Sequence, residues 1–366
     1  PKAAKGLIAA IDRVITEIGA TKEKPVYIME ICGGHTHAIF RSGLDRLTPP
    51  GLEFIHGPGC PVCVLPMSRV DECVELAERP EVIFTTFGDA MRVPGTKKSL
   101  MQSKAEGADI RMVYSPLDAL ELARRNPDRE VVFFGLGFET TTPSTALSIQ
   151  QAARDGLSNF SVFCNHITVP PPIKALLDDP HMVLDGFVGP GHVSMVIGTK
   201  PYDFIAEDYG KPIVVAGFEP LDLLQGLHML VELLENGRGE VSNQYTRSVR
   251  RDGNDDARRV MEEVFTVADM AWRGIGEIPM SGLRLSDAYQ RFDAETKFDV
   301  DRIEVSEPEL CISGEVLRGR KRPTDCPAFG RECTPESPLG APMVSSEGAC
   351  AAYHAFRRQE GVEHGV

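Results

Sequence analysis

The sequence contains little that would suit a membrane-spanning or nucleic-acid-binding protein. No segment approaches the roughly 18–20 consecutive apolar residues that a membrane-spanning helix needs. Basic residues are in deficit, with 39 Lys and Arg against 53 Asp and Glu, so the net charge is −14. Nonspecific binding to nucleic acid needs a basic surface and is therefore not expected. With 42% hydrophobic and 25% charged residues, the chain is not expected to be disordered either.

The chain also lacks a signal peptide at its beginning, so we expect a cytoplasmic protein. Its nine cysteines are an odd number for a disulfide framework. In a reducing cytosol, clustered cysteines more often bind metal or carry out redox chemistry. The length of 366 residues favours two or three domains.

Residues 25–235 alternate between short apolar runs and amphipathic stretches. We predict strands at residues 26–32, 52–56, 82–86, 110–114, 131–135, 160–166, 186–189 and 213–216. Between them we predict helices at 66–78, 116–125, 142–154 and 220–235. Strand–helix repetition implies parallel sheets with helices on their faces. The predicted fold class is α/β, with two parallel-sheet α/β lobes at residues 1–155 and 156–240.

The composition changes near residue 240, where a C-terminal domain of residues 241–366 is predicted to begin. We expect one helix at 255–271, followed by a Gly- and Pro-rich region with few strands. Residues 306–350 consist almost entirely of loop signals and cysteines. Because so few apolar residues cannot stabilise this region by burial, a bound metal or cluster is expected to do so.

Four cysteines lie in this loop-rich region, and 14, 6 and 16 residues separate them: Cys311, Cys326, Cys333 and Cys350. This spacing matches neither a zinc ribbon nor a bacterial ferredoxin. Four thiolates suit a [4Fe–4S] cluster or a structural zinc ion, and free cysteines are the third possibility.

A second group of cysteines follows the first two predicted strands. Cys32 ends a strand and precedes two glycines, which places it at the carboxyl edge of a sheet, close to His35 and His37. We expect its thiol to be open on one side. Cys60 and Cys63 form a C-x2-C pair before a helix, a pattern typical of a redox-active dithiol. The alternatives are a buried cysteine beside surface histidines, and a tight turn with incidental cysteines.

Because these two segments follow consecutive strands, we expect their thiols to lie near one another. Three thiols and a histidine would make a good site for a soft metal. Cys73 and Cys164 are predicted to be small core residues.

Other polar residues also lie where predicted strands end. Glu139 stands in a glycine turn and is a candidate functional carboxylate. His166 and His192 are either supporting partners of a site or ordinary loop histidines.

Taken together, several segments resemble the HypD family of hydrogenase maturation factors. They are residues 30–37 (EICGGHTH), 57–63 (GPGCPVC), 137–141 (GFETT), 314–319 (GEVLRG), 326–330 (CPAFG) and 343–353 (MVSSEGACAAY). The resemblance extends from about residue 7 to residue 356. It implies two α/β lobes and a third part that holds a [4Fe–4S] cluster.

The resemblance also implies a function, the assembly of the Fe(CN)2CO group of [NiFe] hydrogenases. The implied partners are a small HypC-type chaperone and a HypE-type donor that carries cyanide as a thiocyanate. Cys32 would bind the iron of the assembly site, and Cys60 and Cys63 would be the redox-active pair beside it, within reach of the metal. From the residues themselves we add the hypothesis that Cys60 and Cys63 also help to bind this iron, and that His35 and Glu139 are catalytic residues.

Carried over in the same way, the cluster ligands would be Cys311, Cys326, Cys333 and Cys350. Members of the family often have further cysteines where this chain has Ser313 and Pro342, so two candidate ligands are missing here.

The resulting hypothesis is a redox-active assembly scaffold rather than a conventional turnover enzyme. The alternative is a general iron–sulfur-dependent thiol–disulfide reductase, in which Cys32 has no special role. A purely structural scaffold is a third possibility. No nucleic-acid or membrane partner is expected.

Overall fold

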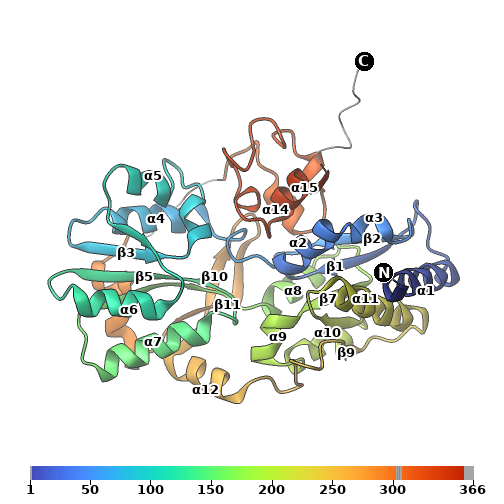
Figure 1. Cartoon of the computed structure of the whole chain (residues 1–366), viewed down its shortest axis with the longest axis horizontal. Coiled ribbons are helices and arrows are strands. Elements are labelled where there is room, and N and C mark those ends of the chain that lie inside the picture. Colours follow the sequence, from blue (N-terminus) through green and yellow to red (C-terminus); the bar gives the residue numbers. More distant parts are fainter. Residues whose placement is uncertain (1, 302, 304, 306, 358–366) are drawn as a thin grey trace.

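The computed structural model describes residues 2–301, 303, 305 and 307–357. Its described part contains a five-stranded sheet, a four-stranded sheet and a two-stranded hairpin. Figure 1 shows the two larger sheets side by side, with helices α14 (Ser313–Leu317) and α15 (Ala349–Arg357), in red, above the junction between them. The α/β fold class with two parallel sheets is therefore confirmed.

The five-stranded sheet is parallel throughout, in the order β2-β1-β7-β8-β9. Its strands are β1 (Val26–Glu30), β2 (Leu52–His56), β7 (Gly186–Pro190), β8 (Ile213–Ala216) and β9 (Val241–Asn243). The helices of this part of the chain are α1 (Lys2–Ile18), α2 (Gly33–Ser42), α3 (Leu44–Leu47), α8 (Pro170–Leu177), α9 (Gly191–Ile197), η2 (Lys200–Tyr202), α10 (Asp203–Glu207) and α11 (Pro220–Glu235). The long helix α11 packs on β7 and β8, and α1 packs on α11.

The four-stranded sheet is also parallel, in the order β4-β3-β5-β6. It comprises β3 (Val82–Thr86), β4 (Ile110–Met112), β5 (Glu130–Gly137) and β6 (Phe160–His166), with helices α4 (Met67–Ala77), η1 (Gly88–Arg92), α5 (Leu100–Ala105), α6 (Pro116–Arg125) and α7 (Thr142–Arg154). Every residue of β3 is buried. Phe84 packs into one core and Ile83 into another, as expected for a strand covered on both faces.

Local sequence signals explain why some helices begin where the prediction placed them. At α6 the Ser115 hydroxyl accepts a hydrogen bond from the Leu117 amide at 3.2 Å, and the Asp118 carboxylate accepts one from the Ser115 amide at 3.0 Å. This reciprocal pairing satisfies backbone donors that a helix start leaves free. Helices α6, α7 and α11 also have proline in their first turn, and their predicted bounds are confirmed.

The eight predicted strands are all present, but their pairing does not follow the predicted boundary between residues 155 and 156. Strands β1 and β2 pair with β7 to β9, and β6 belongs with β3 to β5. The chain thus builds part of the first sheet, builds the second sheet, and then returns to the first. Strand order depends on contacts between distant residues, which the alternation of helices and strands does not reveal.

The predicted helix at 255–271 is wrong in its second half. Helix α12 (Asp255–Val264) ends where β10 (Phe265–Trp272) begins, and β10 pairs antiparallel with β11 (Gly276–Leu285). The apolar residues of β10 satisfy a helical period as well as a strand period, so its identity depends on the partner strand. The hairpin joins the second sheet, because the Thr168 amide after β6 donates to the Ser281 carbonyl at 2.9 Å.

The remaining C-terminal elements are short, as the loop-rich composition predicted. They are η3 (Asp287–Phe292), α13 (Ala294–Phe298), α14 (Ser313–Leu317), η4 (Pro323–Asp325), η5 (Ala341–Met343) and α15 (Ala349–Arg357). Helix α15 packs against α2 of the first sheet. The C-terminal part is thereby attached to the five-stranded sheet as well as to the hairpin.

Arg69 of α4 connects several of these elements, with its side chain 12% exposed. Its guanidinium contacts Glu72 at 2.6 Å and Glu295 of α13 at 2.7 Å, and it donates to Asn165 of β6 at 3.1 Å. It also lies 4.0 Å from the centre of the Phe163 ring. Removal of this cation would leave the Glu72 carboxylate buried without its partner.

We therefore expect Arg69→Ala to lower the free energy of unfolding by about 3–5 kcal/mol, the cost of an uncompensated buried charge. Denaturant unfolding can be followed by the fluorescence of Trp272, the single tryptophan. Arg125→Ala is the matched control, because Arg125 pairs with Glu121 on the surface with its side chain 72% exposed, and should cost less than about 1 kcal/mol. Equal losses in the two variants would contradict the assignment.

Candidate functional site

Cys32 lies immediately after β1, at the carboxyl edge of the five-stranded sheet, as predicted. It precedes the first residue of α2, and its Sγ lies 3.6 Å from Nε2 of His192, which follows β7. The expectation of an open thiol is wrong, because Cys32 is only 2% exposed. Burial, and then the charge of Glu347, raise the pKa of the Cys32 thiol. Without a cation, the sulfur therefore keeps its proton.

The turn at Cys32 is anchored by a buried carboxylate. Glu30 accepts hydrogen bonds from the Cys32 amide at 3.1 Å and from Nδ1 of His56 at 2.6 Å, and also from the Thr36 hydroxyl. Sequence reasoning gave Glu30 no separate role and missed His56. The available signal was a polar residue at the last position of both β1 and β2.

His35 does not contact the Cys32 sulfur in the described structure, but it supports His192 indirectly. Its Nε2 donates toward the carbonyls of Ala216 and Gly217 at 3.2 and 3.1 Å. Burial, and then His192, lower the pKa of His35 to about 4, so the ring is neutral at physiological pH. The Phe218 ring stacks on His35 at 4.6 Å and on His192 at 4.7 Å, which holds the imidazole beside Cys32.

Cys60 and Cys63 are joined by a disulfide in the loop after β2. Because β1 and β2 are neighbours, this loop lies directly against the Cys32 turn, and the Gly33 amide donates to the Gly59 carbonyl at 3.0 Å. A side chain at Gly59 would collide with the Cys32 backbone, so only glycine permits this approach. The expected proximity of the two segments is confirmed, while metal binding by Cys60 or Cys63 would require the disulfide to open.

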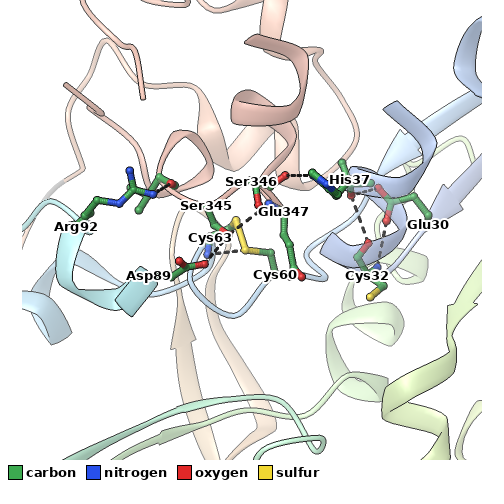
Figure 2. Close-up of a disulfide and its surroundings, with 12 residues drawn as sticks. Glu30, Cys32, His37, Cys60, Cys63, Asp89, Arg92, Ser345, Ser346 and Glu347 are labelled. Carbon is green, nitrogen blue, oxygen red and sulfur yellow. Dashed lines mark hydrogen bonds between the residues drawn. A yellow bond between two sulfur atoms is a disulfide. The ribbon is translucent and has the colours of Figure 1, made fainter. Parts of the chain in front are cut away.

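A segment of the C-terminal part, residues 344–348, completes the site. The Ser345 hydroxyl donates to Asp89 at 3.0 Å, and Nδ1 of His37 donates to the Ser346 carbonyl at 3.2 Å. In Figure 2 the side chain of Glu347 lies between the disulfide and Cys32. The segment therefore bridges the ends of both large sheets.

Two cavities open beside this segment. One of about 510 Å³ is lined by Cys60, Asp89, His192 and Glu347, among others. The other, of about 650 Å³, is lined by His37, His192 and Phe218 together with Glu347. His192 and Glu347 line both cavities, so a ligand in either one would lie close to the imidazole that contacts Cys32.

Glu139 lies in the turn after β5, where it is 2% exposed. Its Oε1 accepts the Val169 amide at 3.0 Å, and its buried Oε2 has no hydrogen-bond partner among the described residues. Burial raises the pKa of Glu139 to about 7. The carboxyl and Cys32 both lie within electrostatic range of the buried Tyr202, whose pKa they help to raise after burial itself.

The four C-terminal cysteines lie close enough to influence one another. Burial, and then the other three thiols, raise the pKa of Cys350. Burial also raises the pKa of Cys333; the Leu339 and Gly340 amides act in the opposite direction, and Cys311 and Cys326 add smaller increases. Sγ of Cys333 accepts the Leu339 amide at 3.3 Å. Within the described residues, no three His, Cys, Asp or Glu side chains converge on a single ion. A four-iron cube places each thiolate on a different iron, so it needs wider spacing than one ion does.

The remaining candidates have structural positions. Cys73 is fully buried, and the Cys164 thiol donates to the Leu283 carbonyl at 3.2 Å, which confirms both as core residues. His166 is buried and bonded to Gly137 and Thr145 at 3.2 and 2.9 Å, without a contact to the Cys32 turn. Among the described helices, none is both long and apolar enough to cross a membrane.

The fold and site define a thiol-bearing α/β protein in which one parallel sheet brings a cysteine–histidine pair and a disulfide loop together at its carboxyl edge. Residues 3–357 match the family model named HypD and described as the hydrogenase formation hypA family. The chain is 69% identical to the hydrogenase maturation factor HypD of Rhodobacter capsulatus, over 97% of this chain and 96% of that protein. Its identity to the Escherichia coli protein of the same name is 55%, over 98% and 97% of the two chains. The chain belongs to the HypD family of hydrogenase maturation factors.

The raised pKa of Glu139 makes stability depend on pH. Between pH 4.5, the ordinary value, and about 7, the folded protein retains a proton that the unfolded chain has lost. The stabilisation by the protonated Glu139 carboxyl is therefore complete below pH 4.5 and is lost as the pH rises through about 7. Glu139→Gln should remove this dependence and gain about 3 kcal/mol relative to the original protein above the folded pKa. Denaturation at several pH values checks this, with the exposed Glu81→Gln as control; parallel pH profiles for the original protein and the Glu139→Gln variant would refute it.

Proposed function

We propose that this protein assembles the Fe(CN)2CO group of [NiFe] hydrogenases, with Cys32 binding the iron that is its substrate. The observation that carries the proposal is the position of the Cys32 sulfur, 3.6 Å from His192, a residue that lines both cavities, with the loop of the disulfide packed against the Cys32 turn. Cys73 and Cys164 are packed in the core, whereas the Cys32 thiol lies against an imidazole. A cation would stabilise its thiolate, and a neutral histidine would support that ligand.

The dithiol supplies the electrons that cyanide transfer requires. A thiocyanate that loses cyanide as an anion must gain two electrons at its sulfur as the carbon–sulfur bond breaks. Oxidation of Cys60 and Cys63 from thiols to the disulfide releases two electrons and two protons. In this proposal the disulfide between Cys60 and Cys63 is the state of the pair after transfer.

The C-terminal cysteines fit a [4Fe–4S] cluster. Cys311, Cys326, Cys333 and Cys350 would hold it, and the Leu339 amide is already directed at one of these sulfurs. When bound, the cluster supplies one-electron redox chemistry. Residues 344–348 connect the cluster-binding part to the Cys32 cleft, through the hydrogen bonds of Ser345 and Ser346, and cover this cleft from solvent.

The partners follow from the same chemistry. The acidic chain and the two cavities lined by His192 suit docking of a small HypC-type chaperone beside the iron, and a HypE-type protein as cyanide donor. We place this work in the cytoplasm. A general thiol–disulfide reductase would also use Cys60 and Cys63, but it would not need the cysteine–histidine pair.

Cys32→Ala tests the proposal directly. The purified complex should lose the infrared bands of iron-bound cyanide and carbon monoxide, while its fold and cluster absorbance remain. His192→Ala should weaken iron retention by roughly 10- to 100-fold, as the loss of a supporting group does. Cys73→Ala, which removes a fully buried core thiol, is the control and should keep the bands. Diatomic-ligand bands in a Cys32→Ala complex would exclude Cys32 as the iron ligand.

Cys333→Ala tests the cluster separately. Because the loops around it have few apolar anchors, we expect loss of the four-iron chromophore together with faster proteolysis of residues 307–357. Iron and sulfide analysis and limited proteolysis measure the two effects. Cys164→Ala should change neither, since its thiol lies in the core beside Leu283. Unchanged iron content in Cys333→Ala would show that this cysteine is not a ligand.

A further inference from the structure

The two sulfurs of the disulfide lie in different surroundings. Cys60 lines the cavity of about 510 Å³ together with Asp89, His192 and Glu347. Cys63 is not among the residues that line it; both cysteines are buried, at 4% exposed for Cys60 and 1% for Cys63, so the cavity lining is what separates them. A molecule that enters the cavity therefore meets Cys60 and not Cys63.

Cys63 is enclosed by the C-terminal part. A methyl group added at Gly348 would lie 3.0 Å from the Cys63 sulfur and would collide with the Pro342 carbonyl. The Gly348 amide is already donated to the Ser345 carbonyl at 2.9 Å, so it is not directed at the sulfur. Gly348 immediately precedes α15, the helix that carries Cys350. The Cys63 sulfur thus faces the start of that helix, where no space remains for a reactant.

The hydrogen bonding of the pair is also unequal. Sγ of Cys60 accepts the Cys63 amide at 3.3 Å, whereas no hydrogen bond to the Cys63 sulfur is present among the described residues. An N–H donor stabilises negative charge on the sulfur that accepts it. Once the disulfide is reduced, this donor favours charge on Cys60.

We propose that the two cysteines have separate roles: Cys60 attacks an oxidised sulfur compound admitted to the cavity, and Cys63 resolves the product. The identity of that compound as a thiocyanate rests on the proposed function. The carboxylates of Asp89 and Glu347 line the cavity and disfavour an anionic reactant, so the substrate class is an uncharged compound of the form R–S–X.

The two steps balance. The Cys60 thiolate attacks the sulfur of R–S–X, a sulfur–sulfur bond forms, and X leaves with the electron pair of the broken S–X bond. The Cys63 thiol then loses its proton to solvent and attacks the Cys60 sulfur. The intramolecular disulfide closes and R–S⁻ leaves. The pair is oxidised by two electrons and R–S–X is reduced by two.

The test uses the full-length reduced protein and neutral dithiodipyridine, a symmetrical aromatic disulfide, with anaerobic stopped-flow detection and peptide mass mapping. Cys63→Ser should form a stable mixed disulfide at Cys60. Cys60→Ser should label Cys63 at least about tenfold more slowly. Cys73 in the same samples is an internal reference for an enclosed thiol. Dithiobisnitrobenzoate, which carries two negative charges, should label Cys60 more slowly than the neutral reagent.

Equal rates at the two positions, or faster labelling of Cys63, would overturn the division of roles. Equal rates for the neutral and the anionic reagent would overturn the assigned substrate charge. Where a serine variant fails to fold, the reduced original protein can be treated with less than one equivalent of a neutral alkylating agent. Peptide masses then give the ratio of labelling at Cys60 to labelling at Cys63. None of these measurements involves iron. Failure of the thiol prediction would therefore not change the infrared result, and absence of the infrared bands would not change the labelling ratio of Cys60 to Cys63.

Discussion

The parallel pairing of β1 with both β2 and β7 is the constraint on which the site depends. Strands that run in the same direction end at the same edge, so the residues after three strands meet there. This register brings together the Cys32 turn, the disulfide loop and His192, although Cys32 and His192 are 160 positions apart in the sequence. The second sheet and the C-terminal part are then added around an arrangement that the first sheet has already fixed.

Buried polar groups hold that arrangement in one conformation. Glu30 receives hydrogen bonds from the backbone of Cys32 and from the His56 ring, and Phe218 is held between two imidazoles. A buried carboxylate with several donors is costly to disturb, because each broken bond leaves a polar group without water. The Cys32 thiol is consequently held in place by neighbours that are themselves fixed by hydrogen bonds and ring stacking.

Much of the fold could be predicted from the sequence because its signals are local. Helix α6 begins at a serine, a proline and an aspartate that together fix its first turn, and the strands of both sheets are short apolar runs between such helices. The carboxyl-edge position of Cys32 followed from the same alternation. Strand order did not, since β6 and β7 are consecutive in the chain but lie in different sheets.

The parts of the site that escaped prediction depend on long-range contacts. Two imidazoles stacked on Phe218, and a carboxylate shared between Cys32 and His56, come from segments whose proximity no local pattern reveals. The hairpin of β10 and β11 was missed for a related reason, because its first strand also reads as a continuation of α12. For Glu139, the position in a turn was visible, but its burial was not.

The placement of residues 344–348 has a consequence for biosynthesis. Residues 344–348 are synthesised long after Cys32, the disulfide loop and His192. In a nascent chain that lacks this segment, the thiols are therefore exposed to solvent. The cleft acquires its enclosed shape only after residues 344–348 have been synthesised and Ser345 reaches Asp89. Premature capture of a metal by an unfinished chain would therefore occur at an open, solvated site, which differs from the one that the complete protein presents.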